Sequence, residues 1–169
     1  ESAIWWALEE KEKLPHTRKY IRAAYDLLLD AIDGLIYGEG LSTEETLAVL
    51  EKVEDLERLM TDGTPWNTGW GITKDHLERA KRLVKLGRME EVWEQLRLSV
   101  EAAIEFDNRP EEETKESLLL GEVVLKRVNY DTADSRPLRE ILRDKWLADE
   151  ALDGIRDREE FKKIVALLD

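Results

Sequence analysis

Cysteine is absent from this chain of 169 residues, and only two histidines, four prolines and nine glycines are present. Without cysteine the chain has no disulfides, zinc ribbons or thiol nucleophile. Two histidines are too few for a histidine-rich metal site. Neither His16 nor His76 follows a glutamate by three residues, as a di-iron carboxylate bundle requires. Nucleophile elbows and glycine-rich phosphate loops are also missing. We therefore expect no metal, no cofactor and no catalytic residue.

Long apolar runs are missing as well, since no stretch approaches the ~20 residues that span a membrane. The segment 3–8 is too short for a signal peptide and is flanked by acids. We expect no membrane contact, and the lack of cysteine fits the reducing cytoplasm. Because the chain begins with Glu1 rather than Met, we expect it to be part of a longer chain.

Positive charge is in short supply, because 39 acidic side chains outnumber 26 basic ones and leave a net charge of −13. Such a surface repels phosphate backbones, so direct nucleic-acid binding by this segment is not expected. The densest basic cluster, at 79–88, is mixed with acids and is interpreted as a solvated helix face with i,i+4 pairs.

Apolar periodicity predicts helices along most of the chain. A first helix is expected over 2–14, ending before Pro15, and a second over 16–37. Ser42 and Glu45 have the spacing of a capping box, which predicts a third helix that ends at 62–63.

The central pattern is a pair of helices over 74–107, joined by the tight turn Leu86-Gly87-Arg88. After Pro110 the apolar runs shorten, and residues 116–126 are open to interpretation as a strand or as an extended segment. Further helices are expected from Pro137, with Ser135 as cap, and over 157–168.

Two features resemble known families. The run from Lys85 to Val92 (KLGRMEEV) resembles the inter-helix turn of a tetratricopeptide repeat, although Val92 replaces the usual alanine and the closing proline is missing. The segments 101–110 and 117–120 resemble the C-terminal region of certain Firmicutes helix-turn-helix transcriptional regulators, and the ending 152–157 before Phe161 is similar too. This resemblance implies a tetratricopeptide-like helical domain that senses, dimerises or binds a peptide or partner.

We therefore predict one all-α domain over residues 1–169. It would be an antiparallel helical array with a tetratricopeptide-like hairpin and a short irregular segment near the C-terminal third.

The least ordinary stretch is 62–72, where three glycines, a proline and two tryptophans lie between helices. A tryptophan in a loop either plugs the edge of a core or contacts a ligand. On the second interpretation the binding residues are Trp66, Asn67, Trp70 and Tyr37.

Asp26, Asp30 and Asp33 share one face of the second helix, either as its solvated side or as an acidic groove for a cation or a basic peptide.

The chain holds six tryptophans, an unusually high number for its length. Trp5 and Trp6 are adjacent and point about 100° apart on a helix, so they are candidates for an interface. Trp66, Trp70 and Trp146 could converge with them on a binding site, or all five could fill separate core edges, whereas Trp93 is expected to be buried or half buried beside Val92.

We predict a non-catalytic sensing or protein-interaction module that binds a peptide or partner protein. The alternative is a structural homodimerisation domain, and a small helical hydrolase is a distant third that would need two carboxylates facing across a cleft.

Overall fold

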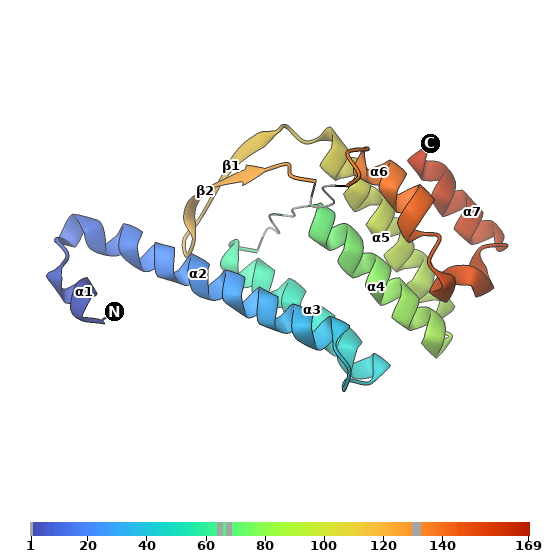
Figure 1. Cartoon of the computed structure of the whole chain (residues 1–169), viewed down its shortest axis with the longest axis horizontal. Coiled ribbons are helices and arrows are strands. Elements are labelled where there is room, and N and C mark those ends of the chain that lie inside the picture. The colour runs from blue at the N-terminus through green and yellow to red at the C-terminus, as the bar shows by residue number, and fades with distance from the viewer. Residues whose placement is uncertain (1, 64–65, 67–68, 130–132) are drawn as a thin grey trace. The chain divides into compact units, whose positions relative to one another are not determined.

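The computed structural model describes residues 2–63, 66, 69–129 and 133–169 (Figure 1). The chain is mostly helical and divides into two compact units. The first unit contains residues 1–66 and 114–125, and the second contains residues 67–113 and 126–169. The single domain over 1–169 stays a prediction, and these units are the parts it would contain.

The first unit contains α1 (Ser2–Ala7), α2 (Glu10–Tyr37) and α3 (Thr43–Met60). The predicted helix end before Pro15 is wrong, because α2 runs through this residue and the break lies at 8–9 instead. α2 begins after Glu9, whose backbone N–H donates to the Glu12 carboxylate (3.0 Å). Pro15 removes only one helical hydrogen bond near this end, and contacts further along α2 outweigh that loss.

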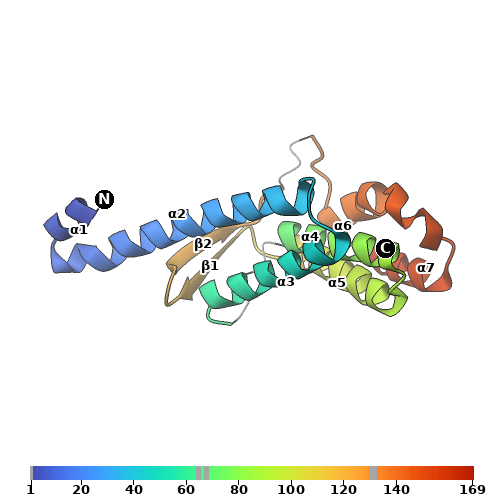
Figure 2. The same cartoon turned by 90° about the horizontal axis from the view of Figure 1, so that it is seen from below.

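α3 begins as predicted. The Glu45 N–H donates to the Ser42 hydroxyl (3.1 Å), and the Ser42 N–H donates to the Glu45 carboxylate (2.8 Å), which completes the capping box. α3 ends at Met60, two residues before the predicted end at 62–63. α2 and α3 lie side by side (Figures 1 and 2).

Residues 112–126, which include the segment left open by the sequence, form a two-stranded antiparallel hairpin of β1 (Glu112–Ser117) and β2 (Gly121–Lys126). The fold is therefore mostly helical rather than purely all-α. β1 reads EETKES, and so it lacks the alternation of apolar and polar side chains that would have identified a strand. Gly121 has a φ of +63°, which lets the chain turn back into β2.

The turn of this hairpin is attached to α2 and α3 (Figure 2). Arg18 and Arg22 of α2 donate to backbone carbonyls of the turn, and the Ser117 hydroxyl donates to the Met60 carbonyl (2.8 Å). Beside these bonds lies a small core of Met60, Trp66 and Leu120, flanked by partly buried side chains that include Tyr25. Burial raises the pKa of the Tyr25 phenol to about 12, and the charges of Glu57 and Asp26 add to the shift.

The second unit is organised around α4 (Trp70–Leu86) and α5 (Met89–Asn108), which lie side by side (Figure 1). Gly87 joins them in the left-handed conformation (φ 71°, ψ 14°), as the predicted turn requires. Both helices run beyond the predicted 74–107, and Trp70 is the first residue of α4 rather than a loop residue.

Short helices complete the second unit: α6 (Leu138–Ile141), the π-helical turn η1 (Leu142–Trp146), the 3₁₀ segment η2 (Glu150–Ile155), α7 (Glu159–Val165) and the 3₁₀ turn η3 (Ala166–Leu168). The predicted Ser135 cap is wrong. Instead, the Asp107 carboxylate of α5 accepts the backbone N–H groups of Leu138 (2.7 Å) and Arg139 (3.0 Å). This cap comes from 31 residues away, beyond any local pattern. Pro137 precedes α6 rather than opening it.

Candidate functional site

A groove of about 690 Å³ lies on the second unit along α5, α7 and η3, and we call it the α5–α7 groove. Two buried side chains and one half-exposed side chain supply its apolar surface, and six charged side chains supply the rest. Its lining residues are Glu90, Glu91, Trp93, Glu94, Arg97, Glu160, Lys163, Ile164 and Leu167.

Helical spacing places these residues on facing sides of the groove. Trp93 and Arg97 are four residues apart on α5, so they lie on one face of that helix. Lys163 and Leu167 have the same spacing along α7 and η3, with Ile164 between them. The indole of Trp93 and the side chain of Ile164 are buried, whereas Leu167 is 53% exposed. The groove therefore has an apolar floor with one accessible aliphatic edge.

The charge of the groove is negative, because four glutamates face one arginine and one lysine. Glu91 is already paired, since it accepts a hydrogen bond from Arg88 Nε (2.6 Å). Across the residues that the structure describes, Glu90, Glu94 and Glu160 make no ion pair. These three carboxylates can bind a cationic group without first giving up an internal partner.

The predicted binding residues that the structure describes are divided between the two units. Trp66 is 8% exposed in the core of the first unit, and Tyr37 is the last residue of α2 in that unit, 56% exposed. Trp70 is 6% exposed and belongs to the second unit. Asn67 lies outside the described residues. Trp66 and Trp70 thus have the burial of core side chains, as in the first of the two sequence interpretations.

Part of the expected convergence of tryptophans is present inside the second unit. The Trp70 ring meets the Trp146 ring edge-to-face, with centroids 5.2 Å apart. The Trp70 ring also meets the Phe106 ring edge-to-face, with centroids 6.4 Å apart. The Lys74 ammonium sits 5.3 Å from the Trp146 ring centroid. Gly69 precedes this cluster at a φ of +59°, and an added Cβ there would lie 2.4 Å from Phe106 Cβ.

The predicted interface tryptophans differ in exposure. Trp6 is 74% exposed, whereas Trp5 is partly buried and donates from its indole N–H to the Thr17 hydroxyl (3.2 Å). The two rings meet edge-to-face at 4.9 Å. Lys13 lies over the Trp5 ring (4.7 Å), so Trp5 ties α1 to α2 and Trp6 is left pointing to solvent.

The two histidines contact other side chains, and the three aspartates of α2 face solvent. His76 Nδ1 lies 2.8 Å from Gln95 Oε1, and the His16 ring stacks edge-to-face on Tyr20. Asp26, Asp30 and Asp33 are exposed on α2. Among the described residues, no group of three His, Asp or Glu side chains is arranged to hold a metal ion.

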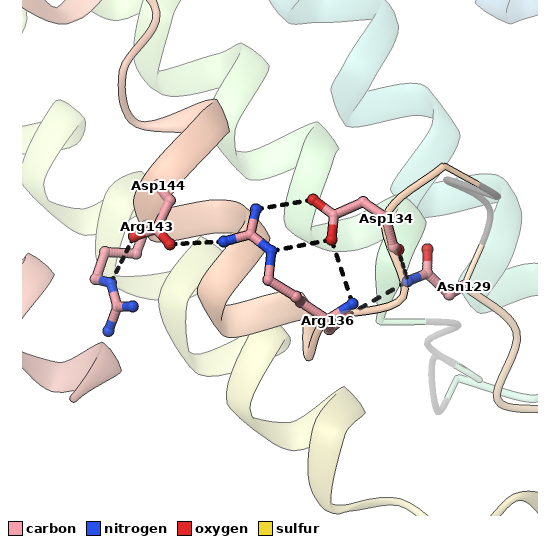
Figure 3. Close-up of polar contacts among 5 residues, drawn as sticks. All are labelled: Asn129, Asp134, Arg136, Arg143 and Asp144. Atoms are coloured by element: carbon pink, nitrogen blue, oxygen red, sulfur yellow. Dashed lines mark hydrogen bonds and ion pairs between the residues drawn. The ribbon is translucent and has the colours of Figure 1, made fainter.

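A polar network on the second unit ties the loop before α6 to η1 (Figure 3). The Arg136 guanidinium donates to both oxygens of Asp134 (3.0 and 2.8 Å) and to Asp144 (2.7 Å), and Arg143 also donates to Asp144 (2.8 Å). The hydrogen bond from Arg136 lowers the pKa of Asp134 to about 2. Because Arg136 already bridges two carboxylates, we assign this network to structure rather than to ligand binding.

Sequence reasoning missed the α5–α7 groove, although its residues carried a weak signal. Glu90, Glu94 and Arg97 follow one another at helical spacing beside Trp93, which marks a charged face next to an aromatic side chain. Nothing local indicates that α7, about seventy residues later, supplies the other side.

Comparison with protein-family models, curated proteins and solved structures finds no match. No helix within the described ranges is long and apolar enough to cross a membrane. The role of the chain is therefore inferred from the chemistry of its own residues.

Proposed function

We propose that the chain is a non-catalytic protein-interaction module that binds a basic amphipathic segment of a partner protein in the α5–α7 groove. The observation that carries this proposal is the combination of an apolar floor with an acidic rim in one groove of about 690 Å³. A helix or extended peptide with alternating aliphatic and lysine or arginine side chains complements both parts.

Each part of the groove has a separate task in this proposal. Leu167, which is 53% exposed, would bury aliphatic side chains of the peptide, over a floor formed by the largely buried Trp93 and Ile164. Glu90, Glu94 and Glu160 would select cationic side chains and speed the encounter, helped by the net charge of −13. The function predicted from sequence is kept, while its proposed site moves from Trp66 and Trp70 to the α5–α7 groove.

We also infer that α4 and α5 form a tetratricopeptide-like hairpin. The left-handed Gly87 between the two helices and the fully buried Val92 in the second helix support this inference. On the same basis the chain would be the sensing part of a transcription regulator-like protein, as its resemblance to Firmicutes regulators implies.

The test is fluorescence anisotropy with a labelled helical peptide of leucine and lysine repeats, and with the same peptide carrying glutamate at every lysine. We expect the basic peptide to bind and the acidic one to bind at least tenfold more weakly. E90K/E94K should weaken binding of the basic peptide at least tenfold, because two attractive charges become repulsive. L167A should weaken it by removing the accessible aliphatic edge of the groove.

E94K alone changes one charge of the groove, and its matched control is E101K, which makes the same charge change two turns along α5, outside the groove. It should leave the affinity within about twofold of the wild-type value. If E101K weakens binding as much as E94K does, the attraction belongs to the whole acidic surface and the groove is not the site.

A further inference from the structure

α2 in the first unit leaves a row of apolar side chains uncovered. On a helix with 100° per residue, these positions fall within an arc of about 100°. The four large members are between 38% and 70% exposed, and the two alanines are exposed as well. We call this set the α2 row; its members are Tyr20, Ala24, Leu27, Leu28, Ala31 and Leu35.

The α2 row reads the same in both directions. Its members lie symmetrically about the midpoint between Leu27 and Leu28, and the spacings from that midpoint are equal on the two sides. In an antiparallel pair of α2 helices centred there, Ala24 would face Ala31 of the other copy, and the leucines would meet at the centre. The tyrosine at one end would meet the leucine at the other. Alanines on either side of the centre allow the helix axes to approach closely.

The charges of α2 also suit that arrangement. Residues 13–22 carry four lysines and arginines and no acid, whereas residues 23–37 carry three aspartates and no base. An antiparallel pair sets the basic half of each helix beside the acidic half of the other, and a parallel pair would set like charges together. Opposed helix dipoles favour the antiparallel pair as well.

From the palindromic spacing and the segregated charge, we infer that the α2 row is a self-association surface whose partner is a second copy of this chain, packed antiparallel across a two-fold axis. An interface of this kind uses the same patch on both copies, so the patch must be complementary to itself. A different partner protein would place no such condition on the spacing of the row. This inference is independent of the α5–α7 groove, which lies in the other unit.

The experiment is sedimentation equilibrium of the whole chain between about 1 and 100 μM. The wild-type protein should approach twice the 19.7 kDa of one chain as its concentration rises. A24K/A31K places like charges opposite one another in the antiparallel pair, and we expect its dissociation constant to rise at least tenfold. A24K/A31E changes the same two positions but places opposite charges together, and should dimerise at least tenfold more tightly than A24K/A31K.

Lysine and glutamate are good helix formers, so circular dichroism should show unchanged helix content in all these variants. L59K is the control for added charge, because Leu59 is 65% exposed on α3 and outside the α2 row; it should dimerise like the wild type. A wild-type chain that stays monomeric throughout would overturn the inference, since the row would then be covered by other means. Equal dissociation constants for A24K/A31K and A24K/A31E would overturn it as well.

Discussion

The two units differ in how far they bury their apolar side chains. In the second unit, α5 contributes several side chains with no exposure, Leu96 and Val100 among them. Ile141, Leu142 and Leu152, which lie on other helices of this unit, are fully buried as well. The core around Trp66 in the first unit has three buried members, and the helix beside it keeps leucines that are half or more exposed.

The cause of this difference is the number of covering layers. α5 is contacted by α4, α6, α7 and η3, and its exposed side chains are confined to one face that includes Glu94, Glu101 and Glu105. α2 is contacted by α3 and by the hairpin turn on one side and by Trp5 of α1 near its start, and the apolar stripe extends around the helix beyond these contacts. The same amphipathic pattern therefore produces a closed core in one unit and a surface for association in the other.

The largest expected effect comes from shortening one leucine in each unit. L96A should lower the free energy of unfolding by about 2–5 kcal/mol, because Leu96 is fully buried and leaves a cavity. L59A in the first unit should change it by less than about 0.5 kcal/mol, since Leu59 is 65% exposed. Urea denaturation followed by circular dichroism measures both. Equal losses would mean that Leu59 is covered as fully as Leu96.

The next effect compares helix caps. D107A should cost about 1–2 kcal/mol, because Asp107 accepts two backbone N–H groups at the start of α6. S42A in the first unit removes one such bond from an exposed cap and should cost less, about 0.5–1 kcal/mol. S135A is the control and should be neutral in thermal melts. If S135A lowers the stability as much as D107A does, then Ser135 caps α6 and the assignment to Asp107 is wrong.

The smallest effect is a pH dependence confined to the second unit. Because Arg136 lowers the pKa of Asp134 to about 2, the stability from this pair is present above the ordinary value of 3.8 and is lost as the pH falls from about 4 toward 2. The melting temperature of D134N should therefore fall less over that range than that of the wild type. D157N, at an exposed aspartate outside the network, should follow the wild-type curve. If the melting temperature of D134N falls with pH as steeply as that of the wild type, the Asp134–Arg136 pair does not contribute to the stability of the unit.

Local signals in the sequence predicted those parts of the fold that are determined locally. The Ser42–Glu45 capping box and the Gly87 turn each depend on a few adjacent residues, and both lie where they were predicted. Pro15 misled the prediction because its local preference to end a helix is outweighed by contacts that α2 makes with a hairpin about 100 residues later.

The candidate site was harder to predict, because burial is a property of the whole fold. Trp66 and Trp70 occur in a glycine-rich stretch that is typical of an exposed loop, yet both are covered by residues distant in the sequence. Trp93 looked like one more helical core residue, and only the position of α7 shows that a groove opens beside it. The exposure of the α2 row could not be predicted either, because an apolar stripe predicts an apolar helix face without saying whether another element covers it.

The attachment of α2 to the hairpin turn bears on how the chain tolerates mutation. Within the described part of the chain, Arg18 and Arg22 donate only to main-chain oxygens, those of Leu118, Leu120 and Glu122. Every amino acid offers the same carbonyl group, so the outward side chains at 118 and 122 can vary during evolution without loosening this joint. The two arginines lack that latitude because their guanidinium groups are the donors, and Gly121 lacks it because its φ is +63°. Substitutions should therefore accumulate at the outward positions 118 and 122 and be scarce at Arg18, Arg22 and Gly121.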